Sequence, residues 1–405
     1  MKCGLLGRHL CHSYSPQIHK TLGDYDYRLF EIEPEDLSAF LTQKDFDGLN
    51  VTIPYKKAVI PFCSSLSPQA EAVGAVNTII KTADGKLIGH NTDYFGFSYM
   101  LSHSGLTVTG KKVLILGSGG ASTTVAAVLK EVQANAVIVS RTGENNYENL
   151  HLHADAAVIV NTTPVGMYPD NGHSPIDLTQ FPKLEGVLDL IYNPARTALL
   201  LNAEKQGLVA MNGLCMLVAQ AKESAEWFIK DTISDKVIGD IHSKLKSQME
   251  NIALIGMPGC GKSTIGMLLA EKTGRELIDV DALIVKRAGK SIPEICAESG
   301  ENGFRALETE VLSEICMKSG LVIATGGGCV TRQENYPLLH QNSNIIWIKR
   351  DISLLPTDGR PLSQGQQLEI MYKDRAPLYE AFSDFAIMND ALPENAVNTI
   401  LGGLI

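Results

Sequence analysis

A glycine-rich loop after a short apolar run is the stretch of sequence with the clearest chemistry. Residues 256–264 read GMPGCGKST and follow the apolar residues 252–255, which fits the pattern G-x-x-x-x-G-K-[ST]. Glycine allows the backbone to curl so that successive N–H groups point at phosphate oxygens, and the following helix adds the positive end of its dipole. Lys262 is expected to reach the β- and γ-phosphates, and the Ser263 hydroxyl to bind Mg²⁺. The loop therefore predicts a nucleotide-phosphate site.

Four polar clusters lie at the ends of predicted strands in the first hundred residues, where α/β proteins place their sites. They are Ser13–Pro16, Asn50–Lys56, Gly74–Thr78 and His90–Asp93. Each has a structural alternative: the two serines could cap a helix, Lys56 could be a surface lysine, and Asp93 or Thr92 could cap the next helix. Together they supply hydroxyls, an amide and a Lys/Asp pair. A lysine ammonium can protonate the alkoxide that develops when hydride reduces a ketone, and a nearby carboxylate keeps it charged.

Composition limits the classes of protein that the chain can represent. Its 405 residues are 44% hydrophobic and 20% charged, which indicates two or three globular domains. The net charge of −10 argues against nucleic-acid and acidic-membrane partners. The eight cysteines form no C-x-x-C pair and no zinc-ligand spacing, so reduced thiols and a cytoplasmic location are expected. No apolar run approaches the ~18 residues of a membrane span, and residues 2–6 read as a strand rather than a leader.

The elements that must position these residues follow two patterns. The first hundred residues alternate strands and helices and include a hairpin, 75–81 with 86–91, turned at Asp84-Gly85. A strand at 111–116 then leads into the glycine loop 117–121 and a helix over 121–133. Further strands are predicted at 136–140, 156–161, 186–191 and 208–211. This β-α-β rhythm indicates a parallel sheet of Rossmann type.

The end of the second strand in this series distinguishes between dinucleotides. It reads Val139-Ser140-Arg141-Thr142, where an NAD site would place Asp or Glu for the ribose 2′-OH. Arginine suits the 2′-phosphate of NADP by charge and bidentate geometry. A surface arginine is the alternative, and Gly143 and Glu144 supply no second basic group.

After the phosphate loop, residues 277–281 predict a strand end that includes Asp279 and Asp281, two residues apart and therefore on one face. The apolar strand 321–324 opens into three glycines at 326–328, a pattern typical of close backbone approach to a ligand. Arg305 and Arg375 are candidates to bind a carboxylate, although either could form a surface ion pair instead.

Residues 1 to about 248 resemble the shikimate dehydrogenase family in motifs, order and spacing. The matching stretches are S-x-S-P-x-I-H at 13–19, N-V-T-I-P-x-K at 50–56, G-A-V-N-T at 74–78, N-T-D-x-x-G at 91–96, G-S-G-G-A at 117–121, N-x-T-P-x-G-M at 161–167, D-x-x-Y-x-P at 189–194 and N-G-L-x-M-L-V-x-Q at 212–220. The resemblance implies a substrate subdomain (1–100 and 214–232) and an NADP subdomain (101–213), with the active site in the cleft between them.

The resemblance also implies roles for single residues. Lys56 and Asp93 would be the catalytic pair, Tyr192 would approach the substrate near the nicotinamide, and Gly213 would contact the nicotinamide. The other expected substrate contacts are Ser13, Ser15, Thr52, Asn77 and Gln220. The other expected NADP contacts are Gly117, Ser118, Gly119, Gly120, Ala121, Ser140, Arg141 and Thr142. The sequence departs from the family at Cys215, usually glycine, and at Ser140, often asparagine.

Residues 251–405 resemble shikimate kinase, a P-loop fold with a parallel sheet that uses ATP and Mg²⁺. The matching stretches are the phosphate loop, Leu277–Asp281, Phe304–Glu308, Gly326–Gly328, Gly359–Leu362 and Arg375–Tyr379. The implied ATP contacts are Gly259, Cys260, Gly261, Lys262, Ser263, Thr264 and Arg360. Ser263 and Asp279 would lie at the metal. Asp281, acting as base, would bind shikimate together with Arg305, Gly327, Gly328 and Arg375, and Glu308 would support them. The implied lid, 353–364, is short and contains a single arginine.

The two resemblances name consecutive reactions, and residues 233–250, with apolar residues at helical spacing, predict a helical junction without a flexible linker. The sequence therefore predicts a bifunctional enzyme of aromatic amino acid biosynthesis that acts on small-molecule substrates, 3-dehydroshikimate and shikimate. Two alternatives stay open. The dehydrogenase half could act on quinate with NAD, or one half could be a non-catalytic ligand sensor. The sequence predicts no oligomeric state.

Overall fold

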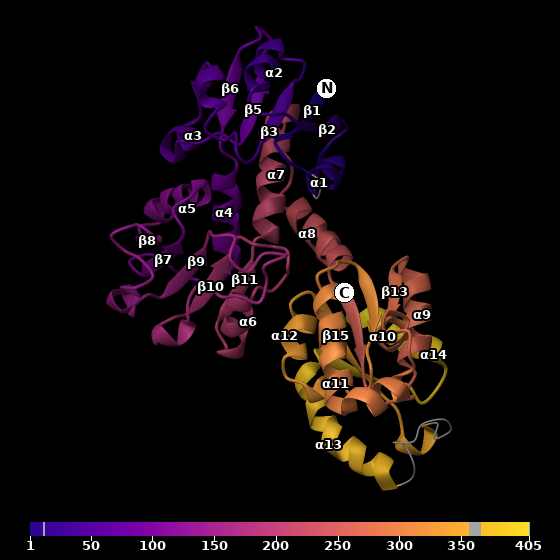
Figure 1. Ribbon diagram of the computed structural model, residues 1–405. Coiled ribbons are helices and arrows are strands. Elements are labelled where there is room, and N and C mark those ends of the chain that lie inside the picture. The colour runs from indigo at the N-terminus through magenta and orange to yellow at the C-terminus, as the bar shows by residue number, and fades with distance from the viewer. Residues whose placement is uncertain (11–12, 356–365, 405) are drawn as a thin grey trace. The chain divides into compact units, whose positions relative to one another are not determined.

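The computed structural model describes residues 1–10, 13–355 and 366–404 (Figure 1). The chain divides into two compact units, each with its own hydrophobic core. Unit 1 comprises Met1–Gly166, His173–Tyr192 and Leu199–Lys244, and unit 2 comprises Met167–Gly172, Asn193–Ala198 and Leu245–Ile405. Arg360 and most of the expected lid lie outside the described residues.

The first part of unit 1 is a six-stranded mixed sheet of order β2-β1-β3-β5-β6-β4. Its strands are β1 (Lys2–Gly7), β2 (Asp26–Glu31), β3 (Gly48–Val51), β4 (Ser65–Leu66), β5 (Thr78–Lys81) and β6 (Leu87–His90). Strands β1, β2 and β3 are parallel, whereas β5 is antiparallel to both β3 and β6. The β5–β6 hairpin confirms the predicted one, and Gly85 adopts the positive φ of 79° that its turn requires.

Among the described residues, four helices pack with this sheet: α1 (Ser15–Leu22), α2 (Leu37–Gln43), α3 (Pro68–Val73) and the helix that returns late in the chain, α7 (Leu214–Ile229), with a 3₁₀ turn at Ile60–Phe62. Helix α4 (Asp93–His103) instead adds buried apolar side chains to the core of the second sheet of unit 1. Helix α7 contacts both α1 and α4, so segments more than a hundred positions apart in the sequence are neighbours in the fold (Figure 1). Leu6, Leu49 and Ile79 are fully buried in the core below the first sheet.

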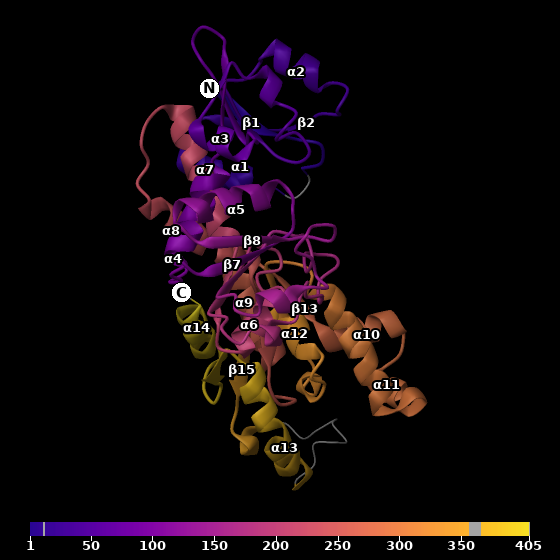
Figure 2. The same ribbon diagram turned by 90° about the vertical axis from the view of Figure 1, so that its left-hand side faces the viewer.

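The second part of unit 1 is a five-stranded sheet of order β11-β10-β9-β7-β8, parallel throughout. Its strands are β7 (Lys112–Leu116), β8 (Asn135–Val139), β9 (Val158–Asn161), β10 (Gly186–Asp189) and β11 (Val209–Asn212), and its helical segments are α5 (Gly120–Glu131), α6 (Ala198–Lys205), η2 (Leu150–His153) and η3 (Leu178–Gln180). Helix α5 packs on β7 and β8 (Figures 1 and 2). Two clusters of buried apolar side chains, on opposite faces, confirm the predicted Rossmann-type sheet.

Unit 2 contains a second five-stranded parallel sheet, of order β13-β14-β12-β15-β16. Its strands are β12 (Asn251–Ile255), β13 (Glu276–Asp279), β14 (Leu321–Ala324), β15 (Ser343–Lys349) and β16 (Phe385–Met388). Its helices are α9 (Lys262–Thr273), α10 (Val280–Ala288), α11 (Ile292–Ile315), α12 (Asn335–His340), α13 (Gln366–Phe382) and α14 (Pro393–Gly403), with 3₁₀ turns at Cys329–Thr331 and Ile352–Leu354. The loop 256–261 joins β12 to α9, as predicted.

The predicted strand that would include both Asp279 and Asp281 is wrong in its extent. Strand β13 ends at Asp279, which is the N-cap of α10, and Asp281 lies in the first turn of that helix. The Asp279 carboxylate accepts a hydrogen bond from the Ala282 N–H at 3.1 Å. This cap satisfies a helix-end N–H group that has no partner within the helix, and helix formation therefore ends the strand.

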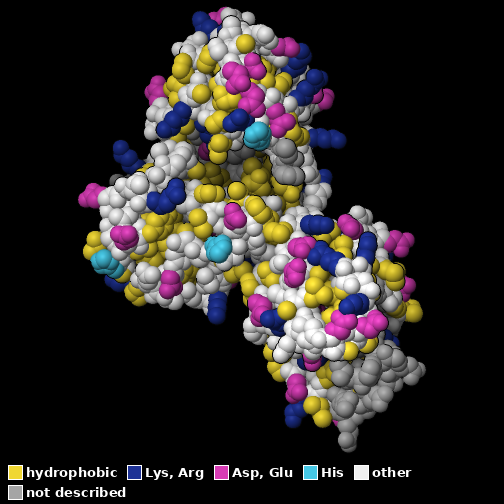
Figure 3. All heavy atoms as spheres, in the orientation of Figure 1, with side chains coloured by type: hydrophobic (Ala, Val, Ile, Leu, Met, Phe, Trp, Pro, Cys, Tyr) yellow, Lys and Arg dark blue, Asp and Glu magenta, His cyan; other side chains and the backbone are white. Residues whose placement is uncertain are grey.

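The predicted junction helix is present as α8 (Lys236–Met249), and the division between the two units falls within it. Its apolar residues at helical spacing, Ile238, Ile241, Leu245 and Met249, are all buried. Within the described ranges no helix is long and apolar enough to cross a membrane. Every cysteine that the structure describes is a free thiol. In the view of Figure 3, acidic and basic side chains are interspersed over each unit.

Glu223 on α7 is half-buried, and its Oε2 is buried without a hydrogen-bond partner among the described residues. Burial, together with the nearby Glu226, raises the pKa of Glu223 to about 7, although Lys222 lowers it. Lys222 is already paired with Glu226 and Asp235, at 2.7 and 2.8 Å. The Glu223 carboxylate therefore destabilises unit 1 whenever it is charged.

We expect Glu223→Gln to stabilise unit 1 at pH 8 by about 2–3 kcal/mol and to have little effect near pH 4.5. The folded pKa lies above the unfolded one, so the cost of the charge grows as pH rises from about 4.5 to 7. The change in the free energy of unfolding is measured by urea unfolding followed through Trp227 emission, in a Trp347→Phe background. Glu148→Gln, at an exposed position, is the control. Equal effects at both pH values would contradict this reading of Glu223.

Candidate active sites

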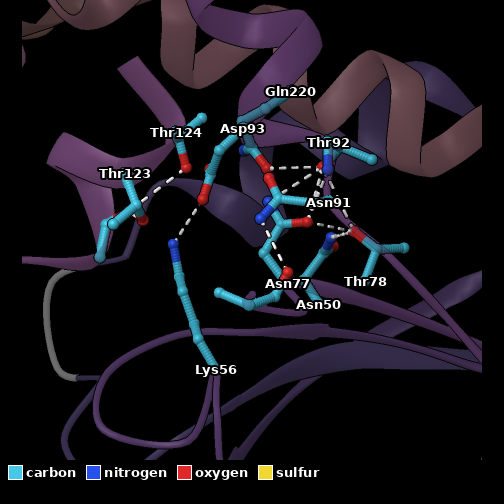
Figure 4. Close-up of polar contacts among 12 residues, drawn as sticks. Asn50, Lys56, Asn77, Thr78, Asn91, Thr92, Asp93, Thr123, Thr124 and Gln220 are labelled. Atoms are coloured by element: carbon cyan, nitrogen blue, oxygen red, sulfur yellow. Dashed lines mark hydrogen bonds and ion pairs between the residues drawn. The ribbon is translucent and has the colours of Figure 1, made fainter. Parts of the chain in front are cut away.

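Lys56 and Asp93 form an ion pair in unit 1, with 2.5 Å between Nζ and Oδ2 (Figure 4). Lys56 lies in the turn after β3, and Asp93 is the first residue of α4. The side chains are 30% and 17% exposed, respectively, so the pair is partly shielded but still open to a ligand. The N-cap of α4 is Thr92, not Asp93, and its side chain does not cap the helix. The Asp93 carboxylate is therefore available to hold the Lys56 ammonium.

Asn77 is fixed beside this pair by the residue that precedes Asp93. Its Oδ1 accepts a hydrogen bond from the Thr92 N–H at 2.7 Å, and its Nδ2 donates to Thr92 Oγ1 at 3.1 Å. Thr92 Oγ1 also contacts Gln220 Oε1 of α7 at 3.5 Å. Three residues predicted to bind substrate thus converge (Figure 4): Asn77 from the residue before β5, Asp93 from α4 and Gln220 from α7.

The two serines and Tyr192 approach the same region from other elements. The N-cap of α1 is Tyr14, and its side chain does not cap the helix. The Ser13 Oγ accepts from the Ser15 N–H at 3.2 Å, and Ser15 is buried. The Tyr192 ring meets the Tyr14 ring edge-on, with 6.2 Å between centroids. Burial raises the pKa of Tyr192, so its hydroxyl remains a hydrogen-bond donor. Thr52 is half-buried directly after β3.

Tyr27 and Asn50 hold Ser15 and Thr78 in place through hydrogen bonds, and the sequence predicted a role for neither. The Tyr27 hydroxyl donates to Asn50 Oδ1 at 2.7 Å and is also hydrogen-bonded to Ser15. Asn50 Nδ2 donates to Thr78 Oγ1 at 3.1 Å. Burial raises the pKa of Tyr27 well above its usual value. Asn50 belongs to a recognisable motif, whereas Tyr27 stands in an ordinary strand and gave no signal.

The expected dinucleotide loop fits a pyrophosphate. Gly117 has φ of +107°, and a Cβ there would lie 2.8 Å from Thr162 Oγ1, so only glycine fits. Gly119 is the N-cap of the 12-residue helix α5, and Gly119, Gly120 and Ala121 are exposed. Their N–H groups stand at the positive end of the helix dipole. Ser122 stands where the dinucleotide-binding pattern G-x-G-x-x-G has its third glycine. It is buried and donates to the Gly119 carbonyl at 3.0 Å.

The remaining residues expected at NADP lie at strand ends of the same sheet. Ser140, Arg141 and Thr142 directly follow β8, and Arg141 is exposed, in a position open to a 2′-phosphate. Gly213 is the N-cap of α7, and a Cβ on it would overlap the Leu190 carbonyl. The N–H groups at the start of α5 and the Arg141 guanidinium therefore fit a dinucleotide that has both a pyrophosphate and a 2′-phosphate.

Unit 2 contains a cavity of about 460 Å³ at the carboxyl end of its sheet. The lining residues are Pro258, Gly259, Gly261, Lys262, Ser263, Thr264, Asp279, Asp281, Ile292, Phe304, Arg305, Thr325, Gly326, Gly327, Gly328, Arg350, Met371 and Arg375. Four side chains in this set are cationic and two are carboxylates. The cavity therefore suits anionic ligands although the chain as a whole is acidic.

One end of this cavity is the phosphate loop. Lys262 Nζ donates to the carbonyls of Gly256 and Met257, at 2.8 and 3.0 Å. Cys260 is fully buried and fills the loop interior. Ser263 Oγ lies 2.8 Å from Asp279 Oδ2, so the two predicted Mg²⁺ residues are adjacent. No group of three or more His, Cys, Asp or Glu residues in the described part of the chain could hold a metal, but Mg²⁺ at nucleotide phosphates needs only one or two protein oxygens.

The other end is built around the three glycines. Arg305 pairs with the fully buried Glu308 at 2.8 Å, and this carboxylate keeps the pKa of Arg305 raised although burial opposes it. A Cβ on Gly328 would overlap Arg305, and one on Gly326 would overlap Glu308. The Gly327 carbonyl accepts hydrogen bonds from Arg375 (3.2 Å) and from the Tyr379 hydroxyl. Arg305, Gly327, Gly328 and Arg375 are thus close together, as predicted.

The first unit therefore has the fold and site of a dinucleotide-dependent oxidoreductase, and the second those of a P-loop phosphotransferase. Residues 5–79 match the family model "Shikimate dehydrogenase substrate binding domain", and residues 258–404 match the model "Shikimate kinase". The chain belongs to the shikimate dehydrogenase family and includes a shikimate kinase domain. It is an oxidoreductase that uses NADP and a kinase that uses ATP.

Relatives match the dehydrogenase part over almost their whole length. The shikimate dehydrogenase (NADP(+)) of Shouchella clausii is 39% identical over 250 residues, which are 55% of this chain and 90% of that protein. Shikimate dehydrogenase 1 of Peptoclostridium difficile superposes with a TM-score of 0.56 at 36% identity, covering 61% of this chain and 98% of its own. A chorismate mutase/shikimate 5-dehydrogenase fusion protein of Clostridium acetobutylicum superposes with a TM-score of 0.57 at 37% identity. The match covers 60% of this chain and 96% of that one.

We expect Tyr27→Phe to raise the KM for the unit 1 substrate about fivefold or more while changing kcat less than twofold. The change removes a buried hydroxyl that holds Asn50 and Ser15, a loss of about 1–2 kcal/mol, but leaves the Lys56–Asp93 pair intact. Steady-state kinetics of the dehydrogenase reaction measure both constants. Tyr99→Phe, whose ring stacks on His103 outside this network, should behave like the parent. A fall in kcat with an unchanged KM would mean that Tyr27 does not position substrate.

Proposed function

We propose that unit 1 reduces 3-dehydroshikimate to shikimate with NADPH, and that unit 2 phosphorylates shikimate to shikimate 3-phosphate with ATP. The observation that supports the first reaction most strongly is the Lys56–Asp93 pair at 2.5 Å beside Asn77 and Gln220. The second reaction is supported by a cationic cavity with a phosphate loop at one end and an arginine-glycine site at the other. The names of the relatives agree with the first reaction, and the family model matched by residues 258–404 agrees with the second.

In unit 1 the chain supplies a proton and orientation. Bound NADPH provides the hydride for the ketone carbon. Lys56 Nζ gives a proton to the alkoxide oxygen as it forms, and Asp93 holds the ammonium in place and favours its charged form. The hydroxyls of Ser13, Ser15 and Thr52 and the amides of Asn77 and Gln220 bind the carboxylate and ring hydroxyls of the substrate. The Tyr192 hydroxyl, kept protonated by burial, donates to the substrate from the dinucleotide side.

In unit 2 the chain aligns two reactants. Lys262 and the N–H groups of the phosphate loop bind the phosphates of ATP, while Ser263 and Asp279 supply the protein oxygens for Mg²⁺. Asp281 accepts the proton of the attacking shikimate hydroxyl. Arg305 and Arg375 bind the shikimate carboxylate through charge-assisted hydrogen bonds. Glu308 fixes Arg305, and the glycines at 327 and 328 allow the ring to approach the backbone.

Substituting Lys56 by Met should reduce dehydrogenase kcat by about 10²–10³-fold, the range for loss of a general acid. The dehydrogenase kcat is measured by NADPH oxidation with 3-dehydroshikimate. As the control, ADP release by the same preparation with shikimate, ATP and Mg²⁺ should be unchanged. Retained NADPH oxidation would support a ligand-sensing role for Lys56. NADH oxidation with dehydroquinate, but none with 3-dehydroshikimate, would establish the quinate alternative.

Substituting Asp281 by Asn should lower ADP release in the presence of shikimate by about 10²-fold or more, because the amide cannot accept the hydroxyl proton. ATP binding should persist, since Asp281 lies at the substrate end of the cavity. The dehydrogenase reaction of the same chain is the internal control. A variant that phosphorylates shikimate at the parent rate would exclude Asp281 as the base.

A further inference from the structure

Arg350 stands at the carboxyl end of β15, next to the phosphate loop. Strand β15 pairs with β12 in the register Ile255↔Trp347, and β12 leads directly into the loop. A Cβ on Gly256 would lie 2.5 Å from the Ile348 carbonyl oxygen, which shows how closely the two backbones approach. Arg350 Nη1 lies 3.5 Å from the Gly259 carbonyl oxygen, and its side chain lines the cavity. The sheet register therefore places the backbone of Arg350 beside the phosphate loop.

The Arg350 guanidinium has no acidic partner among the residues that the structure describes. Its Nε is buried without a hydrogen-bond partner, and the contact with Gly259 is at the limit of hydrogen-bond distance. The adjacent Asp351 side chain instead accepts hydrogen bonds from the N–H and the hydroxyl of Ser353. Other arginines of unit 2 are paired: Arg287 with Glu314 and Arg332 with Glu334. A half-buried cation without a carboxylate is costly unless an anion binds it.

We propose that Arg350 binds a phosphate group of ATP. The proposal rests on the proposed kinase function of unit 2, and it adds a phosphate ligand to that site. Two anions are expected in the cavity, the nucleotide phosphates and the substrate carboxylate. Arg305 and Arg375 contact the glycines at 327 and 328, whereas Arg350 contacts Gly259 of the phosphate loop. Its planar fork of N–H donors matches the oxygens of a phosphate.

Calorimetric titration of the full-length chain with Mg²⁺-ATP, without shikimate, tests the proposal. Arg350→Gln should raise the Kd for ATP about tenfold or more, because charge-assisted hydrogen bonds are lost. Arg350→Lys keeps the positive charge but lacks the paired N–H donors of the guanidinium, so its Kd for ATP should lie between those of Arg350→Gln and the parent. Arg287→Gln, which removes an exposed arginine of the same unit, should bind ATP like the parent.

Steady-state kinetics separate the possible roles. In Arg350→Gln the KM for ATP should rise while the KM for shikimate and the dehydrogenase rate stay unchanged. An unchanged Kd for ATP would overturn the proposal, and so would a rise in the KM for shikimate alone, which would assign Arg350 to the carboxylate. If the parent binds ATP but does not phosphorylate shikimate, the proposed kinase function fails, and the titration still decides the role of Arg350.

Discussion

The direction of the strands determines where both sites form. In a sheet, strands that run the same way end at one edge, so the residues that follow them meet there. In unit 1, β3 and β6 are both antiparallel to β5 and therefore run together, which brings Lys56 and Asp93 to one edge. In unit 2 the same rule brings together the phosphate loop after β12, Asp279 at the end of β13, the glycines after β14 and Arg350 after β15.

Three charged side chains that are fully or partly buried differ in how their charge is compensated. Glu308 is fully buried but paired with Arg305, and so supports a binding arginine. Lys56 is partly exposed and held by Asp93 alone, which leaves its ammonium able to face a substrate. Glu223 has an oxygen without a partner, and it reduces the stability of α7 near neutral pH. The acidic net charge of the chain does not determine the local charge at either site.

Much of both sites was predictable because the family motifs place specific side chains at strand ends. The Lys56–Asp93 pair, Asn77 with Gln220, and Lys262 with Ser263 all lie where the sequence indicated. The shared strand face for Asp279 and Asp281 was wrong because a helix cap competes with strand extension at Asp279. Tyr27 and Arg350 were missed because their importance comes from residues distant in sequence. A tyrosine in a strand or an arginine after one gives no local signal.

The position of Arg350 has an entropic consequence. An arginine on a loop loses conformational freedom when it binds a ligand, and so do the backbone residues around it. Arg350 follows a seven-residue strand inside the sheet, with neighbours β12 and β16, so its backbone is ordered before any nucleotide arrives. Only the rotamers of one side chain remain to be fixed on binding. A preorganised cation of this kind gives more affinity per contact than the same residue on a flexible segment.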